Sequence, residues 1–418
     1  MKSTRMKATV LLSTFSLLLG AVAATESTAA APSGGTIKIG ILHPFTGNYA
    51  GVGAAALGGA TVAADLINQA GGILGKKLVI TTADTLGDPA DAVPALNKLL
   101  NVDHVVAVDG PGGLEAGSTI PILDRNKMAY MLQSGNTKFD TMTDPFAFRV
   151  NASDGQLSVA MALYAIQKGY KTCAMVFSTI DSAQTLKPAI VSTYIKLGGK
   201  IVADVNLTPA QTSYSSEALK VSDAAPQCIF TQMEPATGAV FMNALQQTTS
   251  TVIPFIGSDI TAGSDFVSAI TPALANKELF SIEGASVSGA ATNAFNAAYK
   301  RDFKGAQPLA NSAYTYDATI LLALAITQAK STKGSDIAKA VLLISNARPG
   351  AITVQTYAAG LKALKAGKTI NYDGASGPMD FNKNHNVFGP FEVVNSDLNG
   401  NFIPVATMSA AQLMAASK

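Results

Sequence analysis

The residue types that most often do chemistry in proteins are few in this sequence. Its three histidines are His43, His104 and His385, and none lies in an HExxH motif or a triad-like setting. Neither a GxSxG nucleophile elbow nor a Walker A sequence occurs. His43 alone directly follows an apolar stretch, where a strand end could present it to a ligand. The sequence thus offers no activated nucleophile, and we expect a protein that is not an enzyme.

The two cysteines allow two interpretations. Cys173 and Cys228 each stand near the start of a predicted strand, within "TCAMVF" and "QCIFTQ". Neither belongs to a CxxC motif or has a histidine at metal-ligand spacing. The thiols could be close if the two strands are neighbours. We expect instead two buried free thiols that behave as small apolar residues.

Two kinds of motif-like stretch fall short of a cofactor or metal site. "GVGAAA", from Gly51 to Ala56, fits GxGxxA but lies too far from the preceding strand for a dinucleotide fingerprint. "DFNKNHN" and "NSDLNGNF" place oxygen ligands at alternate positions, but Phe391 and Ala406 stand where a calcium loop needs glutamate. Asn, Asp and Gly favour turns for their own reasons. We therefore expect β-turns here, with no cofactor and no metal.

Two polar loops look better suited to ligand binding. "PGGLEAG" is a glycine loop before a predicted helix, and backbone N–H groups at a helix N-terminus form a cradle for an anion. "SGNT" adds the hydroxyl and amide groups of Ser134, Asn136 and Thr137. Asp259, at the end of "PFIGSD", could pair with an ammonium group. Helix capping is the alternative reading of each feature.

Composition indicates an exported globular protein of more than one domain. The chain has 418 residues, 48% of them apolar and 14% charged, with a formal charge of +2. That charge is too small to indicate a nucleic-acid partner. "MKSTRMK" followed by "VLLSTFSLLLGAVAA" is typical of an export signal, ending at about residue 31. A membrane anchor is the alternative, but the apolar run is shorter than the ~20 residues of a span.

The rest of the chain alternates strands and helices in two successive sets. The first set has strands at 36–42, 76–84, 104–110 and 128–132 and helices at 55–70, 88–100 and 115–126. The second has helices at 154–169, 183–199, 215–223 and 236–247 and strands at 171–177, 200–207, 227–232 and 252–259. Helices follow at 292–303, 312–330 and 334–346, and the turn-rich tail 377–405 predicts antiparallel strands.

This order predicts an α/β protein with two doubly wound, mostly parallel sheets and a cleft between them. In such sheets ligands bind outside the carboxyl ends of the strands. The loops that follow the strands are therefore the candidate site.

Three segments together resemble a known family. "IKIGILHPFTGNYAGVGAAALGGATVAADLINQAGGILGKKLVI" is similar to its opening strand, P-x-[ST]-G loop and long helix ending in N-x-x-GGI-x-G. "ADTLGDPADAV" is similar to its D-x-x-x-DP-x-x-A segment, and "GASGPMDFNKNHN" to a late turn. The family is the type I periplasmic solute-binding proteins of the branched-chain amino acid (Leu/Ile/Val-binding) group, which deliver ligands to ABC importers.

The resemblance implies two lobes joined by a three-segment hinge that closes on the ligand. The first lobe would comprise 36–150 and 284–374, and the second 151–283 and 375–418. The loops "PGGLE" and "QSGNT" would hold an amino acid carboxylate and part of its ammonium, and Asp259, one methylene shorter than the usual Glu, would also contact the ammonium. The expected ligand-binding residues are Phe45, Tyr49, Gly112, Gly113, Leu114, Ser134, Gly135, Asn136, Ile180, Asp181, Met233, Glu234 and Asp259.

The sequence departs from this family where aromatic side chains are common. Ile180 and Asp181 stand where a Tyr is frequent in the second lobe, and Met233 and Glu234 where another would fall. Together with Glu115 and Asp259, these acids would suit a cationic or polar ligand, unless some of them point to solvent.

The expected function is that of a periplasmic solute-binding component of an ABC importer. It would bind one small, amino acid-like molecule, partner a membrane permease, act as a monomer and bind no nucleic acid. A ligand-sensing receptor subunit of the same fold and a secreted α/β hydrolase are the alternatives.

Overall fold

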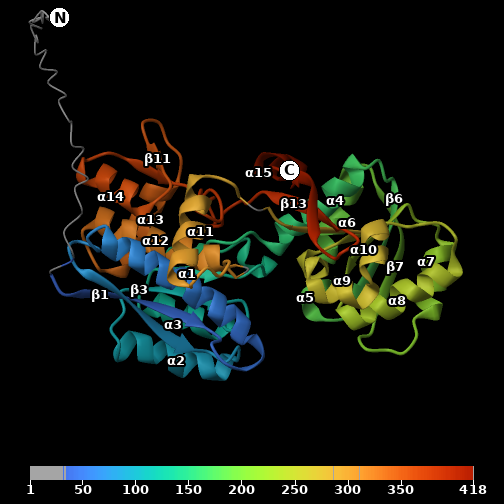
Figure 1. Cartoon of the computed structure of the whole chain (residues 1–418), viewed down its shortest axis with the longest axis horizontal. Helices are drawn as coiled ribbons and strands as arrows, with labels where there is room; N and C mark the ends of the chain where they lie inside the picture. The colour runs from blue at the N-terminus through green and yellow to red at the C-terminus, as the bar shows by residue number, and fades with distance from the viewer. Residues whose placement is uncertain (1–31, 33, 286, 310, 418) are drawn as a thin grey trace, which may run out of the picture.

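The protein folds as two α/β lobes that lie side by side, each with a sheet between layers of helices (Figure 1). The computed structural model describes residues 32, 34–285, 287–309 and 311–417, so the predicted export signal lies outside the described residues. This arrangement confirms the predicted fold class.

A five-stranded parallel sheet, in the order β2-β1-β3-β4-β5, forms the centre of the first lobe. Its strands are β1 (Thr36–His43), β2 (Lys77–Asp84), β3 (Ala107–Gly112), β4 (Tyr130–Gln133) and β5 (Ala147–Arg149). Five of its helices are α1 (Ala50–Gln69), α2 (Pro89–Asn101), α3 (Ala116–Arg125), α11 (Ala290–Asp302) and α12 (Ser312–Ala329). The remaining elements are α13 (Gly334–Ser345), α14 (Tyr357–Lys365) and the small parallel pair β11 (Ile352–Val354) and β12 (Ile370–Tyr372).

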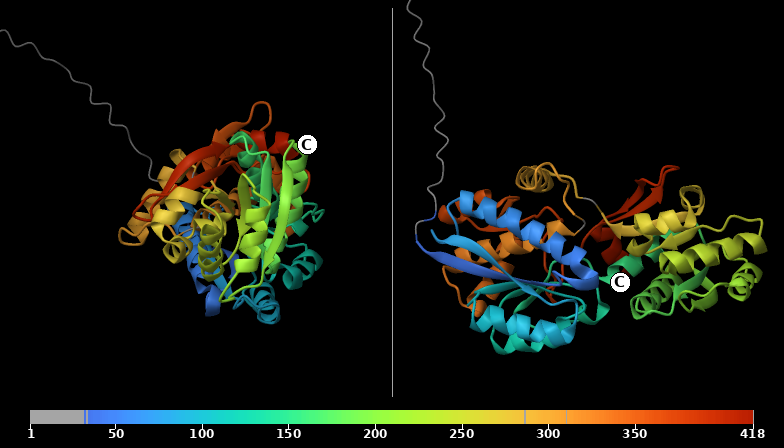
Figure 2. Two further views of the ribbon diagram at one scale, coloured as in Figure 1. Left: turned by 90° about the vertical axis from the view of Figure 1, so that its right-hand side faces the viewer. Right: turned by 60° about the horizontal axis from the view of Figure 1, so that its bottom comes forward.

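The helices cover the sheet of the first lobe on both faces, with α2 and α3 on one side and α1 and α11–α14 on the other (Figure 2). α1 is long and apolar enough to cross a membrane, but it packs against α12 in the core. A Cβ atom on Gly59 of α1 would lie only 2.1 Å from the carbonyl oxygen of Ser312. The small residues of α1 thus allow close helix packing.

The second lobe has a seven-stranded sheet in the order β14-β13-β10-β9-β8-β6-β7. Its parallel strands are β6 (Thr172–Ser178), β7 (Lys200–Leu207), β8 (Cys228–Gln232), β9 (Phe255–Gly257) and β10 (Leu279–Gly284). β13 (Phe391–Ser396) and β14 (Phe402–Met408) add antiparallel strands at one edge, as predicted for the tail.

Helices again cover both faces of the sheet of the second lobe. One face is covered by α4 (Asp154–Gln167), α5 (Asp181–Gln184), α6 (Lys187–Lys196) and α15 (Ala410–Ser417). The other face is covered by α7 (Ser215–Asp223), α8 (Pro235–Thr248), α9 (Ser264–Ile270) and α10 (Pro272–Glu278). The single helix predicted over 183–199 is wrong, because α5 ends and α6 begins anew with Pro188 in its first turn, where a missing N–H has no cost.

The expectation of two free thiols is also wrong. β6 and β8 are neighbours in the sheet, and Cys173 and Cys228 are directly paired in register. Their Cα atoms are 4.6 Å apart, and the two sulfurs form a disulfide. Strand order, which the sequence alone did not fix, is what brings them together.

The chain passes from the second lobe back to the first after β10, and its final crossing comes later than predicted. Met379, Phe381 and Val387 pack in the core of the first lobe, whereas β13 belongs to the sheet of the second. Asn386 also bridges to Arg149 at the end of β5. The third crossing therefore falls between Val387 and Phe391, and a boundary at residues 374 and 375 is too early.

Candidate functional site

The loops after β3 and β4 meet at the edge of the first lobe. A Cβ atom on Gly113 would lie 3.0 Å from Oγ of Ser134, which is itself buried. Oγ of Ser134 accepts a hydrogen bond from the backbone N–H of Asn136, and Asn136 caps the short 3₁₀ helix that follows. The structure thus places Gly112–Leu114 beside Ser134–Asn136, which parallel strand order requires.

The loop after β1 reaches the same edge and is fastened by one carboxylate. Asp84, at the end of β2, accepts hydrogen bonds from the backbone N–H groups of Phe45 at 2.8 Å and Thr46 at 3.3 Å. Tyr49 and Leu114 both lie against Gly87, and their side chains are 46% and 48% exposed. The two residues therefore form an apolar rim that a ligand or the opposite lobe can cover.

Glu115 does not add its charge to this edge. Its carboxylate is buried and accepts hydrogen bonds from the N–H of Gly112 and the hydroxyl of Thr85, each at 3.3 Å. Burial raises the pKa of this carboxyl. Glu115 thus stabilises the glycine loop through hydrogen bonds inside the protein. The prediction that it makes the cleft acidic is wrong.

Asp154, the first residue of α4, contacts the predicted "SGNT" loop but is not among the residues predicted from the sequence. Its N–H donates to the carbonyl oxygen of Gly135 at 2.7 Å, and a Cβ on Gly135 would lie 2.1 Å from its Oδ1. Burial, then the negative charge of Asp259, raises its pKa to about 6, although Arg149 opposes the shift. In the sequence, an acid after the capping Ser153 looks like an ordinary first-turn residue.

Arg149 stabilises the "SGNT" loop by hydrogen bonding to its backbone. Its guanidinium is buried, donates to the carbonyl oxygen of Asn136 at 3.1 Å and pairs with the carboxylate of Asp140. The positive charge is thereby compensated inside the protein, and the loop is fixed in place.

Glu234, a predicted residue of the second lobe, lies at the N-terminus of α8 and contacts the end of β6. The hydroxyl of buried Ser178, at the end of β6, donates to Oε1 of Glu234 at 2.9 Å. Oε2 of Glu234 has no hydrogen-bond partner among the described residues. Ile180 and Asp181 begin α5 beside it, with Asp181 exposed.

Met233 is wrongly predicted as a ligand contact. Its side chain is fully buried and packs in the core with residues of α8 and α9. Met233 directly follows β8, which is buried along its whole length, and its side chain continues that buried run.

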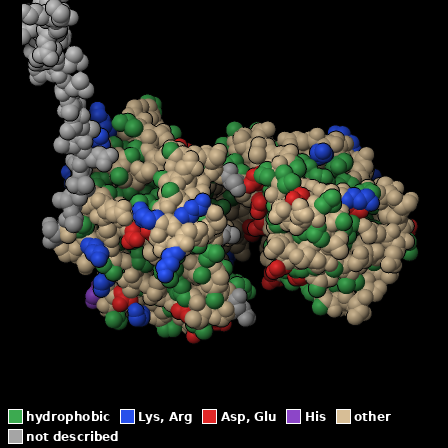
Figure 3. Space-filling view, viewed as in Figure 1, with side chains coloured by type: hydrophobic (Ala, Val, Ile, Leu, Met, Phe, Trp, Pro, Cys, Tyr) green, Lys and Arg blue, Asp and Glu red, His purple; other side chains and the backbone are tan. Residues whose placement is uncertain are grey.

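The second lobe presents carboxyl groups to the hollow between the lobes, and Figure 3 shows acidic side chains along that wall. Asp259 is exposed as a residue, but desolvation of its carboxyl by the surrounding protein raises the pKa, against backbone hydrogen bonds that lower it. Burial, then Glu392 and Asp259, raises the pKa of Glu283 to about 7. Burial, then Asp259 first among the carboxylates, also raises the pKa of Tyr314. Asp259 in η3 (Asp259–Ala262) thus lies close enough to Asp154 of α4 and Glu283 of β10 for its charge to raise their pKa values.

His43 does not take part in this site. It is buried, and burial lowers its pKa to about 4, so its ring is neutral. Neither ring nitrogen has a hydrogen-bond partner in the part of the chain that the structure describes. Within that part, no cluster of His, Cys, Asp or Glu has the geometry of a metal site.

Two doubly wound lobes with strand-end loops around a shared hollow define the class of type I periplasmic binding proteins. The sequence model of the periplasmic binding protein family matches residues 36–401. The chain belongs to this family.

Curated relatives agree with the Leu/Ile/Val-binding group that the motifs resemble. The chain is 28% identical over 217 residues, half of its length, to an amino acid binding protein of Pseudomonas aeruginosa. It is 28% identical over 199 residues, 46% of its length, to Leu/Ile/Val-binding protein homolog 3 of Brucella melitensis. These alignments span little more than half of each relative, 58% and 53%.

Solved structures share the fold at low sequence identity. A branched-chain amino acid transporter periplasmic ligand-binding protein of Burkholderia xenovorans matches with a TM-score of 0.74 at 15% identity, over 90% of this chain and 96% of that one. LivJ of Streptococcus pneumoniae, in complex with isoleucine, matches with a TM-score of 0.68 at 21% identity, over 90% and 99%. A Rhodopseudomonas palustris binding protein holding 3,4-dihydroxybenzoic acid matches at 0.63 and 17%, over 90% and 98%.

Proposed function

We propose that the protein is the extracytoplasmic solute-binding component of an ABC importer. It binds one small, amino acid-like molecule between its lobes, performs no chemical conversion and delivers the molecule to a membrane permease. The observation that carries this proposal is that the strand-end loops of the first lobe, joined through Gly113 and Ser134, also contact Asp154 of the second lobe through Gly135. The predicted export signal and the family favour a periplasmic location, and we expect the protein to act as a monomer.

Each lobe supplies a different part of the ligand site. Backbone N–H groups of the loop at Gly113 and the hydroxyl of Ser134 suit a carboxylate, since they donate hydrogen bonds without bringing a full charge. Asp154 and Asp259 suit an ammonium group. A ligand that joins both sets stabilises the closed arrangement by its differential affinity.

The ligand's side chain meets a polar, acidic second lobe rather than an aromatic one. The paired Ser178 and Glu234, with the exposed Asp181 nearby, favour a side chain that carries hydrogen-bond donors or a positive charge. We therefore place basic and amide-bearing amino acids ahead of branched-chain ones. Isoleucine and dihydroxybenzoic acid are ligands of proteins that share only the fold.

Calorimetric titration of a panel of amino acids tests the site. Ser134→Ala and Asp259→Ala are each expected to weaken binding about tenfold or more, because each removes a direct polar partner. Asp265→Ala is the matched control, since Asp265 is an exposed acid in the first turn of α9, close in sequence to Asp259. Wild-type affinity in both site variants, or turnover of any ligand by the purified protein, would reject the assignment.

A further inference from the structure

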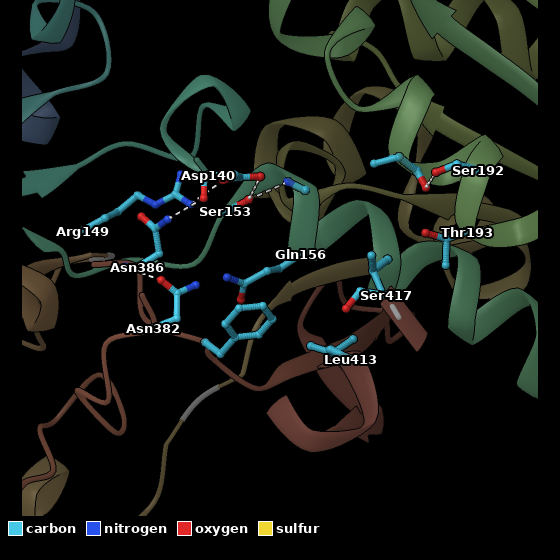
Figure 4. Close-up of a pocket in the computed structure, with 14 residues that line it drawn as sticks. Asp140, Arg149, Ser153, Gln156, Ser192, Thr193, Asn382, Asn386, Leu413 and Ser417 are labelled. Atoms are coloured by element: carbon cyan, nitrogen blue, oxygen red, sulfur yellow. Dashed lines mark hydrogen bonds and ion pairs between the residues drawn. The ribbon is translucent and has the colours of Figure 1, made fainter. Parts of the chain in front are cut away.

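A second pocket lies at the hinge, away from the strand ends. It has a volume of about 320 Å³, within the range of small-molecule sites. Figure 4 shows Arg149 and Asn386 at one end, Gln156 in the middle, and Thr193 and Leu413 at the other end. Its walls thus come from the end of β5, the third crossing, α4, α6 and α15.

Three buried residues of this pocket carry polar atoms that lack a partner. Arg149, Gln156 and Asn386 are 1%, 7% and 2% exposed. Nε of Arg149, Oε1 of Gln156 and Oδ1 of Asn386 have no hydrogen-bond partner among the described residues. Buried polar groups are nearly always paired, so three unpaired ones around one cavity call for an occupant.

The other hydrogen bonds of these side chains show which of the unpaired atoms are donors and which are acceptors. The amide nitrogen of Gln156 donates to the carbonyl oxygen of Val387 at 3.0 Å. The amide nitrogen of Asn386 donates to the carbonyl oxygens of Phe139 and Asp140, both at 3.1 Å. The unpaired atoms are therefore two carbonyl acceptors and one guanidinium N–H donor, a set that a hydroxyl or a primary amide can satisfy.

The charge of the pocket is balanced. Arg149 and Asp140 are its charged lining residues, and they pair with each other. Val159 and Leu413 add apolar surface. A charged guest would lose its hydration without gaining a free counter-charge, so the pocket favours a neutral molecule with a short apolar portion.

α4 separates this pocket from the cleft. Asp154 on this helix lies against Gly135 of the ligand loop, whereas Gln156 and Val159 line the hinge pocket. None of the residues predicted for the ligand site lines it. Occupancy of the pocket is thus a question distinct from the proposed solute binding.

We propose that the hinge pocket between Arg149, Gln156, Asn386 and Leu413 binds a second small molecule, uncharged and bearing hydroxyl or amide groups. The guest donates to the carbonyl oxygens of Gln156 and Asn386 and accepts from Nε of Arg149. These three atoms are shielded from solvent, on side chains that line the pocket, so the guest reaches them through small rotations of those side chains.

The test uses the full chain labelled with ¹⁵N at Gln and Asn side chains, titrated with matched probes. The probes are propionamide and propane-1,2-diol as neutral molecules, and propionate and propylamine as charged ones. At least one neutral probe is expected to shift the side-chain amide signals of Gln156 and Asn386 saturably. Both charged probes are expected to bind at least about tenfold more weakly.

Ala189→Phe, which fills the α6 side of the pocket, is expected to weaken neutral-probe binding about tenfold or more. Ser192→Phe, at an exposed position of the same wall, is a second blocking variant should the first fail to fold. Ile195→Phe, exposed on the same helix and outside the pocket, is the control that should bind as wild type.

Three results would overturn the proposal. Absence of saturable shifts with both neutral probes would mean that the pocket holds water only. Equal binding by the folded blocking variants would place the probe elsewhere. Propionate or propylamine binding as tightly as propionamide would contradict the neutral class of guest. None of these results depends on the solute that the cleft binds.

Discussion

Asp154 lies directly against Gly135, so that a Cβ atom at position 135 would be 2.1 Å from Oδ1 of Asp154. The backbone of the two residues is also joined, by a hydrogen bond of 2.7 Å from the N–H of Asp154 to the carbonyl oxygen of Gly135. This contact ties the proposed carboxylate loop of the first lobe to the first helix of the second. The loop and the hinge must therefore move together.

Gly135→Ala is expected to weaken ligand binding about tenfold and to destabilise the fold by about 1–3 kcal/mol, because the new methyl group displaces Asp154 or the loop. Calorimetric titration and thermal unfolding measure the two effects. Gly51→Ala is the control: nothing lies within 4 Å of its Cβ, and in α1 the alanine should be neutral or stabilising. Equal effects of the two substitutions would contradict this role of Gly135.

The raised pKa of Asp154 predicts that stability falls as the pH rises. In the folded state burial, followed by the charges of Asp259 and Asp140, raises its pKa from the ordinary 3.8 to about 6, and Arg149 opposes the shift. Between these values the folded state holds a proton that the unfolded state has lost. The resulting stabilisation is complete below the lower pKa and is lost as the pH rises through about 6.

Asp154→Asn removes this dependence, because the amide mimics the protonated acid. The variant is expected to unfold at a higher temperature than the wild type at pH 8 and at the same temperature near pH 4. The gain should be about 1 kcal/mol, since partial exposure screens the charge. Thermal unfolding across this pH range is the measurement. An unfolding temperature for Asp154→Asn that lies below the wild-type value at pH 8 would refute the argument.

Much of the fold could be predicted from the sequence because strands such as β1 and β6 are apolar on both faces and a helix such as α2 begins with a clear cap. β1 and β6 are buried along most of their length, and Asp88 caps α2 with Pro89 at its first position, within the helix predicted over 88–100. Parallel order then places the loops after β3 and β4 together, which is why Gly113 and Ser134 could be predicted as neighbours.

Features that depend on which strands are adjacent, or on which way a side chain turns, could not be read in this way. The disulfide between Cys173 and Cys228 could be predicted only by knowing that β8 and β6 are neighbours in the sheet. Glu115 turns inward and Met233 faces the core, although both occupy strand-end loops. Asp154 belongs to a helix N-terminus, and only the tertiary contact with Gly135 shows its place in the site.

Asp84→Ala is expected to loosen the loop that carries Phe45 and Tyr49. Burial opposes ionisation of this carboxyl, but hydrogen bonds from the hydroxyl of Thr46 and from the loop backbone outweigh it and lower the pKa. Removing the carboxylate should weaken ligand binding while lowering the free energy of unfolding by only about 1 kcal/mol, because the loop lies at the surface.

Titration calorimetry and chemical denaturation separate the two effects of Asp84→Ala. Asp91→Ala, an exposed acid in the first turn of α2, is the control and should change neither quantity. Because the pKa of Asp84 is lowered in the folded state, the hydrogen bonds to its carboxylate contribute their full stability above the ordinary pKa of an aspartate. That contribution is lost as the pH falls. Unchanged ligand affinity in Asp84→Ala would show that the loop needs no such fastening.

The disulfide between Cys173 and Cys228 is expected to stabilise the second lobe while remaining out of reach of reductants. It closes a loop with a sequence separation of 55 residues, and removing such a link costs about 2–4 kcal/mol. The double variant Cys173→Ala, Cys228→Ala should therefore unfold at a clearly lower temperature than the oxidised wild type. Both sulfurs are fully buried, so reductant alone should leave the folded wild type unchanged, whereas reductant with denaturant should bring it to the stability of the double variant. An unfolding temperature in the double variant equal to that of the oxidised protein would show that strand packing alone supports this part of the sheet.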